Sequence, residues 1–268
     1  MKHERIYLTG ASSGIGRALA LEFARREPRT FVLTARRVDL LESLAAELEG
    51  LGSTAHVERL DVVDVDAVRT SVRAWHERVG GLDLVIANAG VGEAASVLSQ
   101  SWDDLQVVLD VNARGAIATL FAAIEPMVER GRGTLVGISS LAALRGVPRS
   151  GTYAASKAAL TTWLETIRAD LARTPIEVVD VRPGFVLTAM TENAKHAKPF
   201  EISVEDAARR TVDGIERQKA VVSYAAPMKW LLWGVHRMPD WLWRLIGPRI
   251  QGSGTTAEDR RSSRQDRS

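Results

Sequence analysis

The sequence contains no cysteine among its 268 residues. This absence excludes disulfide bonds, thiolate metal sites and a cysteine nucleophile, and it is typical of a protein that works in a reducing compartment. The five histidines are scattered along the chain without the spacing of metal ligands, so we expect no metal site. Hydroxyl, amide and charged side chains are therefore the candidates for catalytic chemistry.

The chain also has little excess charge and no long uncharged apolar run. Its formal net charge of +2 does not indicate a protein that binds nucleic acid. No uncharged apolar run reaches about 18 residues, so we expect no membrane-spanning helix, and the N-terminus lacks the pattern of a signal peptide. With 46% hydrophobic and 25% charged residues, the composition is that of an ordinary globular protein, and we expect it in the cytoplasm.

A glycine-rich segment directly follows the first predicted strand, Ile6–Thr9. It reads Gly10-Ala-Ser-Ser-Gly-Ile-Gly16 and precedes a helical pattern over Arg17–Arg26. A helix N-terminus offers free N–H groups and the positive end of a dipole, and glycines let a phosphate approach the backbone closely. The spacing differs from the G-x-G-x-x-G fingerprint of dinucleotide sites. A plain tight turn is the alternative, but the position after the first strand favours phosphate binding.

Two basic residues, Arg36 and Arg37, follow the second predicted strand, Thr30–Thr34. In a dinucleotide fold, an acidic residue near this point binds the ribose 2′-hydroxyl of NAD, whereas a basic residue suits the 2′-phosphate of NADP. No acid occurs before Asp39, so the sequence predicts NADP rather than NAD, with Arg36 the better candidate. The alternative is a solvated pair of arginines in a loop.

Strand and helix patterns alternate as far as residue 224. After the first two strands, strands are predicted at 56–60, 82–87, 134–138, 176–181 and 220–224, and helices at 40–48, 66–79, 102–130, 152–173 and 203–217. This alternation predicts one α/β domain over residues 1–224, with a doubly wound parallel sheet of about seven strands between two helical layers. Ligands of such sheets bind outside the carboxyl ends of the strands. Several polar or turn residues follow predicted strands: Gly10, Arg36, Asp61, Asn88, Ser140 and Pro183.

Tyr153 and Lys157 are four residues apart in a predicted helix, so their side chains share one face of it. A nearby ammonium favours the phenolate and lowers the phenol pKa from about 10 toward working pH, which suits a proton donor. Ser140 ends an apolar run that begins at Thr134, so its hydroxyl could face a cleft. A solvated surface pair is the alternative for Tyr153 and Lys157, and the rest of the chain favours the catalytic interpretation.

Six motifs, in order and spacing, resemble those of the short-chain dehydrogenase/reductase (SDR) family in its classical form. They are Thr9–Gly16, Asn88–Gly90, Asn112, Ser140, Tyr153–Lys157 and Pro183–Thr188, and the resemblance covers about residues 4–224. It implies a Rossmann-type oxidoreductase that transfers a hydride between NADP and a ketone or secondary alcohol. It also implies a homodimer or tetramer, with contacts through the helices that begin near Trp102 and Thr152.

The resemblance gives each matching residue a role. Tyr153 would be the general acid for ketone reduction and the base for alcohol oxidation, with Lys157 lowering its pKa and binding the nicotinamide ribose. Ser140 would polarise the substrate oxygen, and Asn112 would bend its helix and hold a water that links Lys157 to solvent. The cofactor would contact Gly10, Ser12, Ser13, Gly14, Ile15 and Gly16 with its pyrophosphate, Asp61, Val62, Asn88, Ala89 and Gly90 with its adenosine, and Pro183, Gly184, Val186 and Thr188 with its carboxamide side.

The chain departs from the family pattern at two positions. Ala87 stands where the family often has the first asparagine of Asn-Asn-Ala-Gly, which concerns the edge of the sheet more than the chemistry. Ser13 stands where some NADP-using members carry a basic residue. The prediction of NADP therefore depends on Arg36 and Arg37.

Residues 225–250 extend past the usual family core, and four of the seven tryptophans lie between Pro227 and Arg249. Pro239 is expected to divide this stretch into two short helices. An apolar face with tryptophans and basic flanks suits a membrane surface, a lid over a hydrophobic substrate or a dimer contact, and the alternative is packing on its own domain. We expect a mobile loop or lid at 189–202 and a disordered polar tail at 251–268.

The sequence thus favours an NADP-dependent oxidoreductase with a small ketone or alcohol substrate that is hydrophobic or lipid-like. Two alternatives stay open. One is a binding protein that senses NADP without turnover, against which the retention of Asn112, Ser140, Tyr153 and Lys157 argues. The other is a scaffold at the membrane surface, bound peripherally through residues 227–249.

Overall fold

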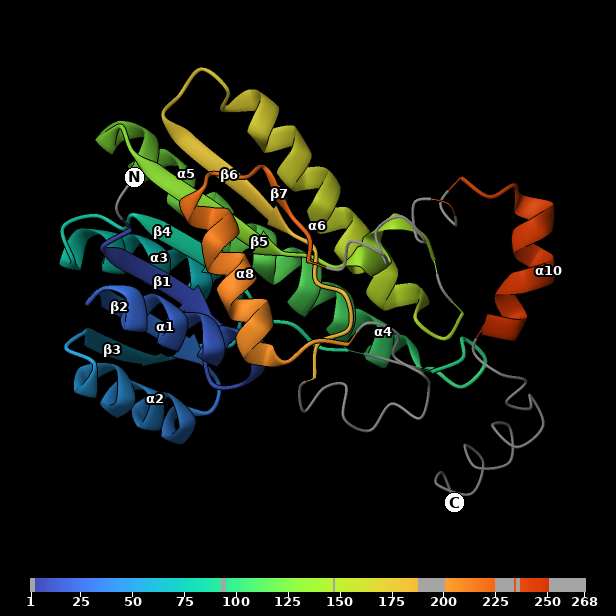
Figure 1. The fold of residues 1–268 in the computed structure, drawn as a ribbon, viewed down its shortest axis with the longest axis horizontal. Coiled ribbons are helices and arrows are strands. Elements are labelled where there is room, and N and C mark those ends of the chain that lie inside the picture. Colours follow the sequence, from blue (N-terminus) through green and yellow to red (C-terminus); the bar gives the residue numbers. More distant parts are fainter. Residues whose placement is uncertain are drawn as a thin grey trace.

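The computed structural model describes residues 3–92, 95–146, 148–187, 201–224, 234 and 237–250. Within them, seven parallel strands form one sheet in the order β3-β2-β1-β4-β5-β6-β7 (Figure 1). The strands are β1 (Arg5–Thr9), β2 (Thr30–Ala35), β3 (Thr54–Arg59), β4 (Leu84–Ala87), β5 (Gly133–Ile138), β6 (Ile176–Val181) and β7 (Val221–Val222). The doubly wound α/β fold expected from the sequence is confirmed.

The strand order reverses between β1 and β4. The chain runs outward from β1 through β2 to β3, crosses back to β4, and then runs outward again to β7. β1 pairs with β2 through Thr9 and Thr34, and with β4 through Leu8 and Ile86. Because loops leave the two halves in opposite directions at this switch point, a crevice opens at the carboxyl ends of β1 and β4.

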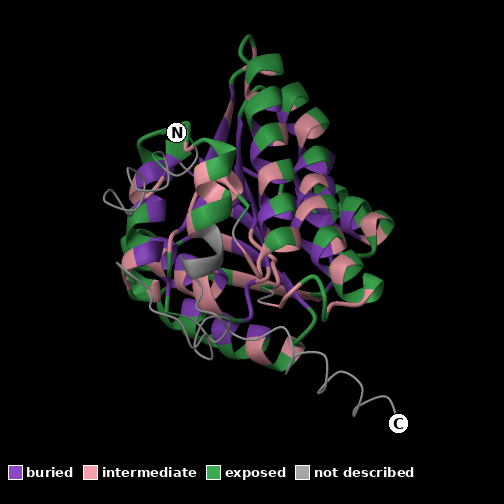
Figure 2. Cartoon of the chain, turned by 90° about the vertical axis from the view of Figure 1, so that its right-hand side faces the viewer, coloured by how far each residue is buried: buried purple, intermediate pink, exposed green. Residues whose placement is uncertain are grey.

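Helices cover both faces of the sheet. One hydrophobic cluster joins the sheet to α1 (Gly14–Arg26), α2 (Val38–Gly50) and α8 (Val204–Glu216). A second cluster joins the other face to α3 (Val65–Arg78), α5 (Ala116–Arg130) and α6 (Gly151–Asp170). Figure 2 shows buried residues on the inner sides of the helices and exposed residues on their outer sides, as amphipathic helices on a sheet require.

Local sequence sets several helix ends. The Asp64, Ser101 and Ser203 side chains accept hydrogen bonds from backbone N–H groups in the first turns of α3, α4 (Trp102–Leu109) and α8. Gly131 closes α5 in the left-handed conformation, with a φ of 72°. α1 begins at Gly14 instead of Arg17, so the glycine segment itself forms the first turn of the helix.

The predicted helix from Trp102 to Arg130 consists of three segments. α4 and α5 are joined by a π-helical turn over Asp110–Gly115, which contains Asn112. The whole run is long and apolar enough to cross a membrane by length and composition. However, 56% of its apolar window is buried inside the fold, where α5 packs against α3 and β4. This is the packing of a core helix.

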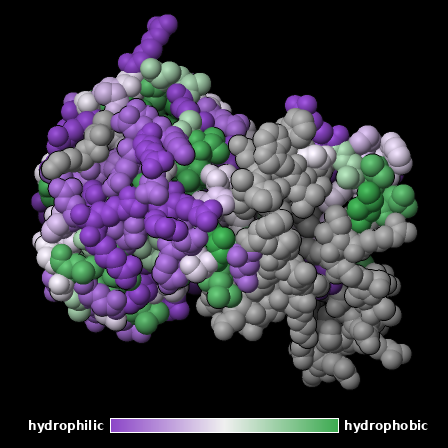
Figure 3. Space-filling view, in the orientation of Figure 1, coloured by the Kyte–Doolittle hydropathy of each residue, from purple (hydrophilic) through white to green (hydrophobic). Residues whose placement is uncertain are grey.

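The C-terminal helix α10 (Asp240–Ile250) begins directly after Pro239, as expected for a proline that ends one segment and precedes the next. Figure 3 shows hydrophobic side chains gathered over α10, where Trp241 is 69% exposed and Leu245 is 54% exposed. Residues 189–200 of the lid predicted at 189–202, the segment 225–233 and the tail at 251–268 lie outside the described residues.

Candidate active site

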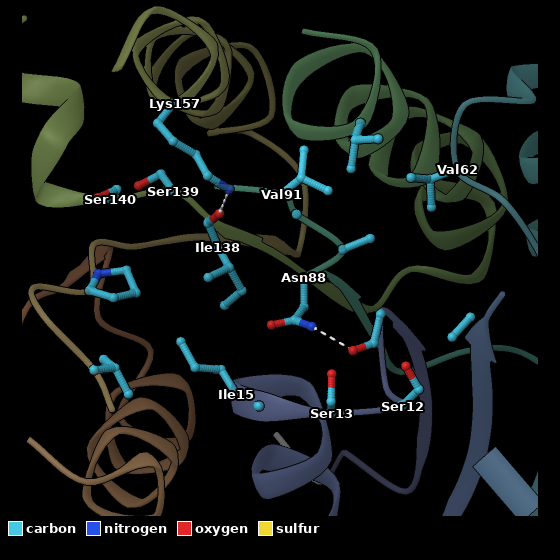
Figure 4. Close-up of a pocket in the computed structure, with 18 of the residues that line it drawn as sticks. Ser12, Ser13, Ile15, Val62, Asn88, Val91, Ile138, Ser139, Ser140 and Lys157 are labelled. Carbon is cyan, nitrogen blue, oxygen red and sulfur yellow. Dashed lines mark hydrogen bonds between the residues drawn. The ribbon is translucent and has the colours of Figure 1, made fainter. Parts of the chain in front are cut away.

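A cleft of about 290 Å³ lies at the switch point, at the carboxyl ends of the strands (Figure 4). The structure brings together in its lining most of the residues predicted from the sequence: Gly10, Ser12, Ser13, Gly14, Ile15, Arg36, Arg37, Asp61, Val62, Asn88, Ala89, Gly90, Ser140, Tyr153, Lys157, Pro183, Gly184 and Val186. Gly16 and Asn112 lie behind the lining, and Thr188 lies outside the described residues. One cleft therefore holds both the glycine segment and the Tyr153–Lys157 pair.

The glycine segment is held against the end of β4. The Asn88 side-chain amide donates to the carbonyls of Thr9 and Gly10, at 3.0 and 3.1 Å. In return, the Thr9 hydroxyl accepts from the backbone N–H groups of Asn88 and Ala89. Gly10 has a φ of +67°, and a Cβ on it would lie 2.7 Å from the Ala89 Cα, so both conformation and space require glycine. A Cβ on Gly16 would collide with Gly10 and Asn88, which assigns Gly16 to packing.

The two arginines after β2 behave differently. The Arg37 guanidinium donates to the hydroxyls of Ser12 and Ser13, at 3.1 and 2.7 Å, and so lies across the glycine segment. The Arg36 side chain is 67% exposed and approaches Asp61 at 3.9 Å. Arg37, and not the preferred candidate Arg36, therefore contacts the glycine segment in this structure.

Lys157 projects from α6 into the cleft, on the same helix face as Tyr153. Its side chain is buried, and its Nζ donates to the carbonyl of Ile138 at 2.8 Å (Figure 4). Nζ lies 5.9 Å from the centre of the Tyr153 ring. Burial lowers the pKa of Lys157 to about 8, and the negative charge of Asp180 opposes this change.

Tyr153 lies within hydrogen-bonding reach of Ser140. Burial raises the pKa of the Tyr153 phenol, and the side-chain hydrogen bond to Ser140 partly offsets that effect. The net direction is opposite to the lowering by Lys157 that we expected from the sequence, because the loss of solvation outweighs the favourable contacts. Ser140 itself is fixed at the end of β5, where its hydroxyl accepts from the N–H of Ala142 at 3.1 Å.

Asn112 connects the loop after β4 to α6. It is fully buried; its Oδ1 accepts from the N–H of Val91 at 2.8 Å, and its Nδ2 donates to the carbonyl of Val91 and to the Ser156 hydroxyl. The Ser156 hydroxyl in turn donates to the Tyr153 carbonyl at 2.7 Å. Asn112 thus bonds backbone from within a π-helical turn, and the water that the resemblance implies there stays a prediction.

Gly90 lies between Asn112 and Lys157. A Cβ at this position would be 3.3 Å from the Asn112 Oδ1 and 3.5 Å from the Lys157 Nζ. Because Gly90 has no side chain, the cleft extends close to the Asn112 Oδ1 and the Lys157 Nζ at this position.

Part of the lining was not predicted from the sequence. Six more residues contribute to it: Ala35, Leu60, Val91, Val111, Ile138 and Ser139. Most adjoin a predicted strand end, so the expected carboxyl edge would have indicated their position. Val111, inside a long helical run, carries no such signal.

Comparison with known proteins gives concordant results. The family model for short chain dehydrogenase matches residues 4–199. A relative from Myxococcus xanthus (strain DK1622), known only as an uncharacterized oxidoreductase, is 42% identical over 224 residues, which make up 84% of this chain and 88% of the relative.

Two solved structures share the fold. A short chain dehydrogenase/reductase from Burkholderia phymatum, in complex with NAD, has a TM-score of 0.80 at 23% identity and covers 87% of this chain and 94% of its own. An alcohol dehydrogenase from the archaeon Thermococcus sibiricus, complexed with 5-hydroxy-NADP, has a TM-score of 0.75 at 26% identity and covers 89% of this chain and 100% of its own. The first of these two proteins was solved with NAD and the second with an NADP derivative.

Proposed function

The chain belongs to the short-chain dehydrogenase family, and on that premise we propose that it interconverts a ketone and a secondary alcohol with NADP in preference to NAD. The observation that carries this proposal is the meeting of Ser140, Tyr153 and Lys157 in one cleft with the glycine segment. A proton donor, a carbonyl-polarising hydroxyl and a phosphate site are the protein groups that such a reaction needs.

The residues of the cleft fit a dinucleotide. The first turn of α1 presents its N–H groups at Gly14 and Ile15, next to a backbone that Gly10 and Gly16 bring close to β4. At the opposite end, Lys157 and Gly90 both line the cleft, and we propose that the nicotinamide ribose binds there beside the ammonium. We propose that Asp61 and Val62 contact the adenine and that Pro183, Gly184 and Val186 contact the nicotinamide carboxamide.

The preference for NADP is supported by the arrangement of Arg37. Its guanidinium and the hydroxyls of Ser12 and Ser13 converge on one point at the rim of the cleft. A 2′-phosphate placed there would accept charge-assisted hydrogen bonds from all three groups. Arg36, more exposed but also in the lining, would add a second positive charge.

A bound nicotinamide cofactor would supply or accept the hydride. The side chains would transfer the proton and orient the substrate. In the direction of reduction, the Ser140 hydroxyl donates to the substrate oxygen, and the Tyr153 phenol transfers its proton to that oxygen as charge develops. In the direction of oxidation, the phenolate accepts the proton, and the ammonium of Lys157 stabilises it. Asn112 holds α6 and the loop after β4 in register, so these groups meet at one point.

A hydrophobic substrate is supported by the residues around the mouth of the cleft. Phe185 and Leu187 follow Pro183 and are 41% and 53% exposed. Beyond them, Arg145 ties the loop between Ser140 and Tyr153 to α10: its Nη1 donates to the carbonyl of Met238 at 2.9 Å, and its guanidinium stacks on Trp243 at 4.9 Å. We propose that this side of the cleft receives the apolar part of the substrate.

The test is consumption of NADPH across a panel of ketones of increasing chain length, with wild type and Tyr153→Phe side by side. We expect turnover that falls at least about 100-fold in the variant, in the range of general-acid contributions, while NADPH binding is retained. NADPH binding by wild type without turnover on any ketone would instead support the dinucleotide-sensing alternative.

We also propose a homodimer through the helices that begin near Trp102 and Thr152, which are α4 with α5 and α6. The outer surface of α4 and α5 exposes Trp102, Val107 and Phe121, at 70%, 51% and 57%, which is a large apolar area for helices that otherwise face the core. Light scattering that shows only a monomer at micromolar concentration would contradict this proposal.

A second candidate function is peripheral attachment to a membrane, favoured by the exposure of Trp241 and Leu245 one turn apart on α10. Sedimentation with anionic liposomes tests it, with the full chain carrying Trp241→Glu and Leu245→Glu as the comparison. If wild type and the double variant both stay in solution, this candidate is discarded.

A further inference from the structure

Asp180 is a fully buried carboxylate that the proposed reaction does not yet use. It lies on β6, paired in register with Gly137 of β5. Its neighbours Ile176 and Val178 belong to the cluster beneath α6, whereas Val179 and Val181 belong to the opposite cluster. Since side chains alternate along a strand, Asp180 faces α6, the helix that carries Tyr153 and Lys157.

Both oxygens of Asp180 are held by specific donors. The Ser139 hydroxyl donates to Oδ1 at 2.5 Å, and the Arg182 Nε donates to Oδ2 at 2.7 Å. The Arg182 Nη2 also donates to the Glu165 carboxylate of α6 at 2.8 Å. A buried charge with a guanidinium partner and a second donor is stable as an ion, so Asp180 carries a negative charge next to the cleft.

Ser139 links the Asp180 carboxylate to the active site. It stands between Ile138, whose carbonyl accepts from Lys157, and Ser140, which bonds Tyr153. The N–H of Ser139 donates to the carbonyl of Val181 at 2.8 Å, which ties the end of β5 to the strand of Asp180. The Asp180 carboxylate is thus hydrogen-bonded to Ser139, which lies in the sequence between the partner of Lys157 and the partner of Tyr153.

The charges around Asp180 come from several elements. α6 contributes Lys157, Glu165 and Arg168, of which Arg168 is directed to the carbonyls of Val178 and Ala220. Its own strand is followed by Arg182. β7, the other neighbouring strand, consists of Val221 and Val222 and carries no titratable group. The negative charge of Asp180 raises the pKa of Lys157 against the effect of burial.

We propose that Asp180 is a positioning residue of the active site, which places a carboxylate under α6, the helix of Lys157, and, through Ser139, fixes Ser140 opposite Tyr153. This inference rests on the proposed function for its kinetic consequence, and on the hydrogen bonds of Asp180 for its structural part. The contrasting possibility is that Asp180 serves only to hold Arg182 and the surface pair with Glu165.

The test compares Asp180→Asn, which removes the charge and keeps the shape, with Glu165→Gln, which removes the outer carboxylate of the same chain of contacts. Ketone reduction by wild type should decline at alkaline pH as Lys157 loses its proton. In Asp180→Asn this decline should move to lower pH by about one unit, the size of a shift expected from loss of a nearby opposite charge. Glu165→Gln should leave it in place.

Ser139→Ala separates orientation from charge. It removes the hydrogen bond to Asp180 but leaves the carboxylate, so kcat should fall without movement of the alkaline decline. If Asp180→Asn has the same pH profile as wild type, the inference is wrong. It is also wrong if the alkaline decline moves equally in Asp180→Asn and Glu165→Gln, because Asp180 then acts only through the surface pair.

A readout without turnover separates this inference from the proposed function. The ¹³Cε resonance of Lys157, in protein labelled at lysine and assigned by its loss in Lys157→Ala, reports the ionisation of the ammonium directly. It should titrate at lower pH in Asp180→Asn than in wild type. If no ketone is ever reduced but this shift occurs, the electrostatic part stands and the proposed function fails; if turnover is found without the shift, the reverse holds.

Discussion

The ammonium of Lys157 reaches across the cleft from α6 to the end of β5, where it donates a hydrogen bond of 2.8 Å to the carbonyl of Ile138. This contact places a positive charge in a buried position, and burial is unfavourable for an ion. The same group that the proposed reaction needs is therefore a source of instability in the folded chain.

Lys157→Met should stabilise the protein at neutral pH while abolishing activity. The pKa of Lys157 is about 8 in the folded chain and 10.5 in its ordinary state, so the free energy of unfolding gains on the order of 3 kcal/mol when the charge is removed. The unfolded chain binds the extra proton between these two pH values, so wild-type stability rises with pH across that window. The difference in the free energy of unfolding between variant and wild type should have its full value below pH 8 and vanish above pH 10.5, as measured by denaturant unfolding. A constant gap at all pH values would show that packing, not charge, causes it.

Arg37→Ala should reduce the affinity for NADPH about 10- to 100-fold and leave the affinity for NADH nearly unchanged. The reason is the loss of charge-assisted hydrogen bonds to the 2′-phosphate, each of which contributes about 1.5–3 kcal/mol. Titration of both cofactors by fluorescence measures the two affinities. Arg36→Ala is the matched control and should have a smaller effect, because Arg36 does not contact the glycine segment. An unchanged ratio of the two affinities in both variants would remove the basis for NADP.

Asn112→Ala should destabilise the fold by about 2–3 kcal/mol, because the N–H and carbonyl of Val91 lose buried partners. Ser156→Ala, which removes only one of the bonds of Asn112, should cost about 1 kcal/mol. Denaturant midpoints give both values. Activity per folded molecule should fall more in Asn112→Ala, since the position of Tyr153 depends on this connection. Equal stability of the two variants would contradict the prediction.

Arg145→Ala should raise KM for long-chain ketones and leave kcat for short ketones within about two-fold of wild type. The substitution releases α10 from the loop between Ser140 and Tyr153 by removing the contacts to Met238 and Trp243. Arg244→Ala, an exposed arginine of α10 that pairs with Asp240, is the control and should change neither constant. Steady-state kinetics with a short and a long ketone measures KM and kcat for both substrates. A uniform loss of kcat on both substrates would show that Arg145 supports the catalytic loop instead of the substrate side.

The sequence predicts the fold and most of the cleft because the informative residues follow strands. Gly10, Asn88 and Ser140 each come directly after an apolar run, and parallel strands bring such positions to one edge. Helix boundaries were less accurate: the expected start at Arg17 missed the first turn at Gly14, since a glycine segment reads as a loop until its hydrogen bonds are known.

Other features depended on three-dimensional packing. Which of Arg36 and Arg37 contacts the glycine segment depends on the directions of their side chains after β2, and the sequence does not reveal these directions. The direction in which the Tyr153 pKa is shifted depends on burial, which the spacing of residues along the sequence does not reveal. Asp180 carries no motif, because its importance arises from Ser139 and Arg182 in space.

The guanidinium of Arg145 joins two parts of the chain that lie almost a hundred residues apart, and it does so only a few residues from the Ser140 hydroxyl. A lipid, another protein or an affinity tag bound on the outer side of α10 would therefore be coupled, through Arg145, to the loop between Ser140 and Tyr153. Rates measured on chains altered at that terminus should be compared with rates from chains left intact there.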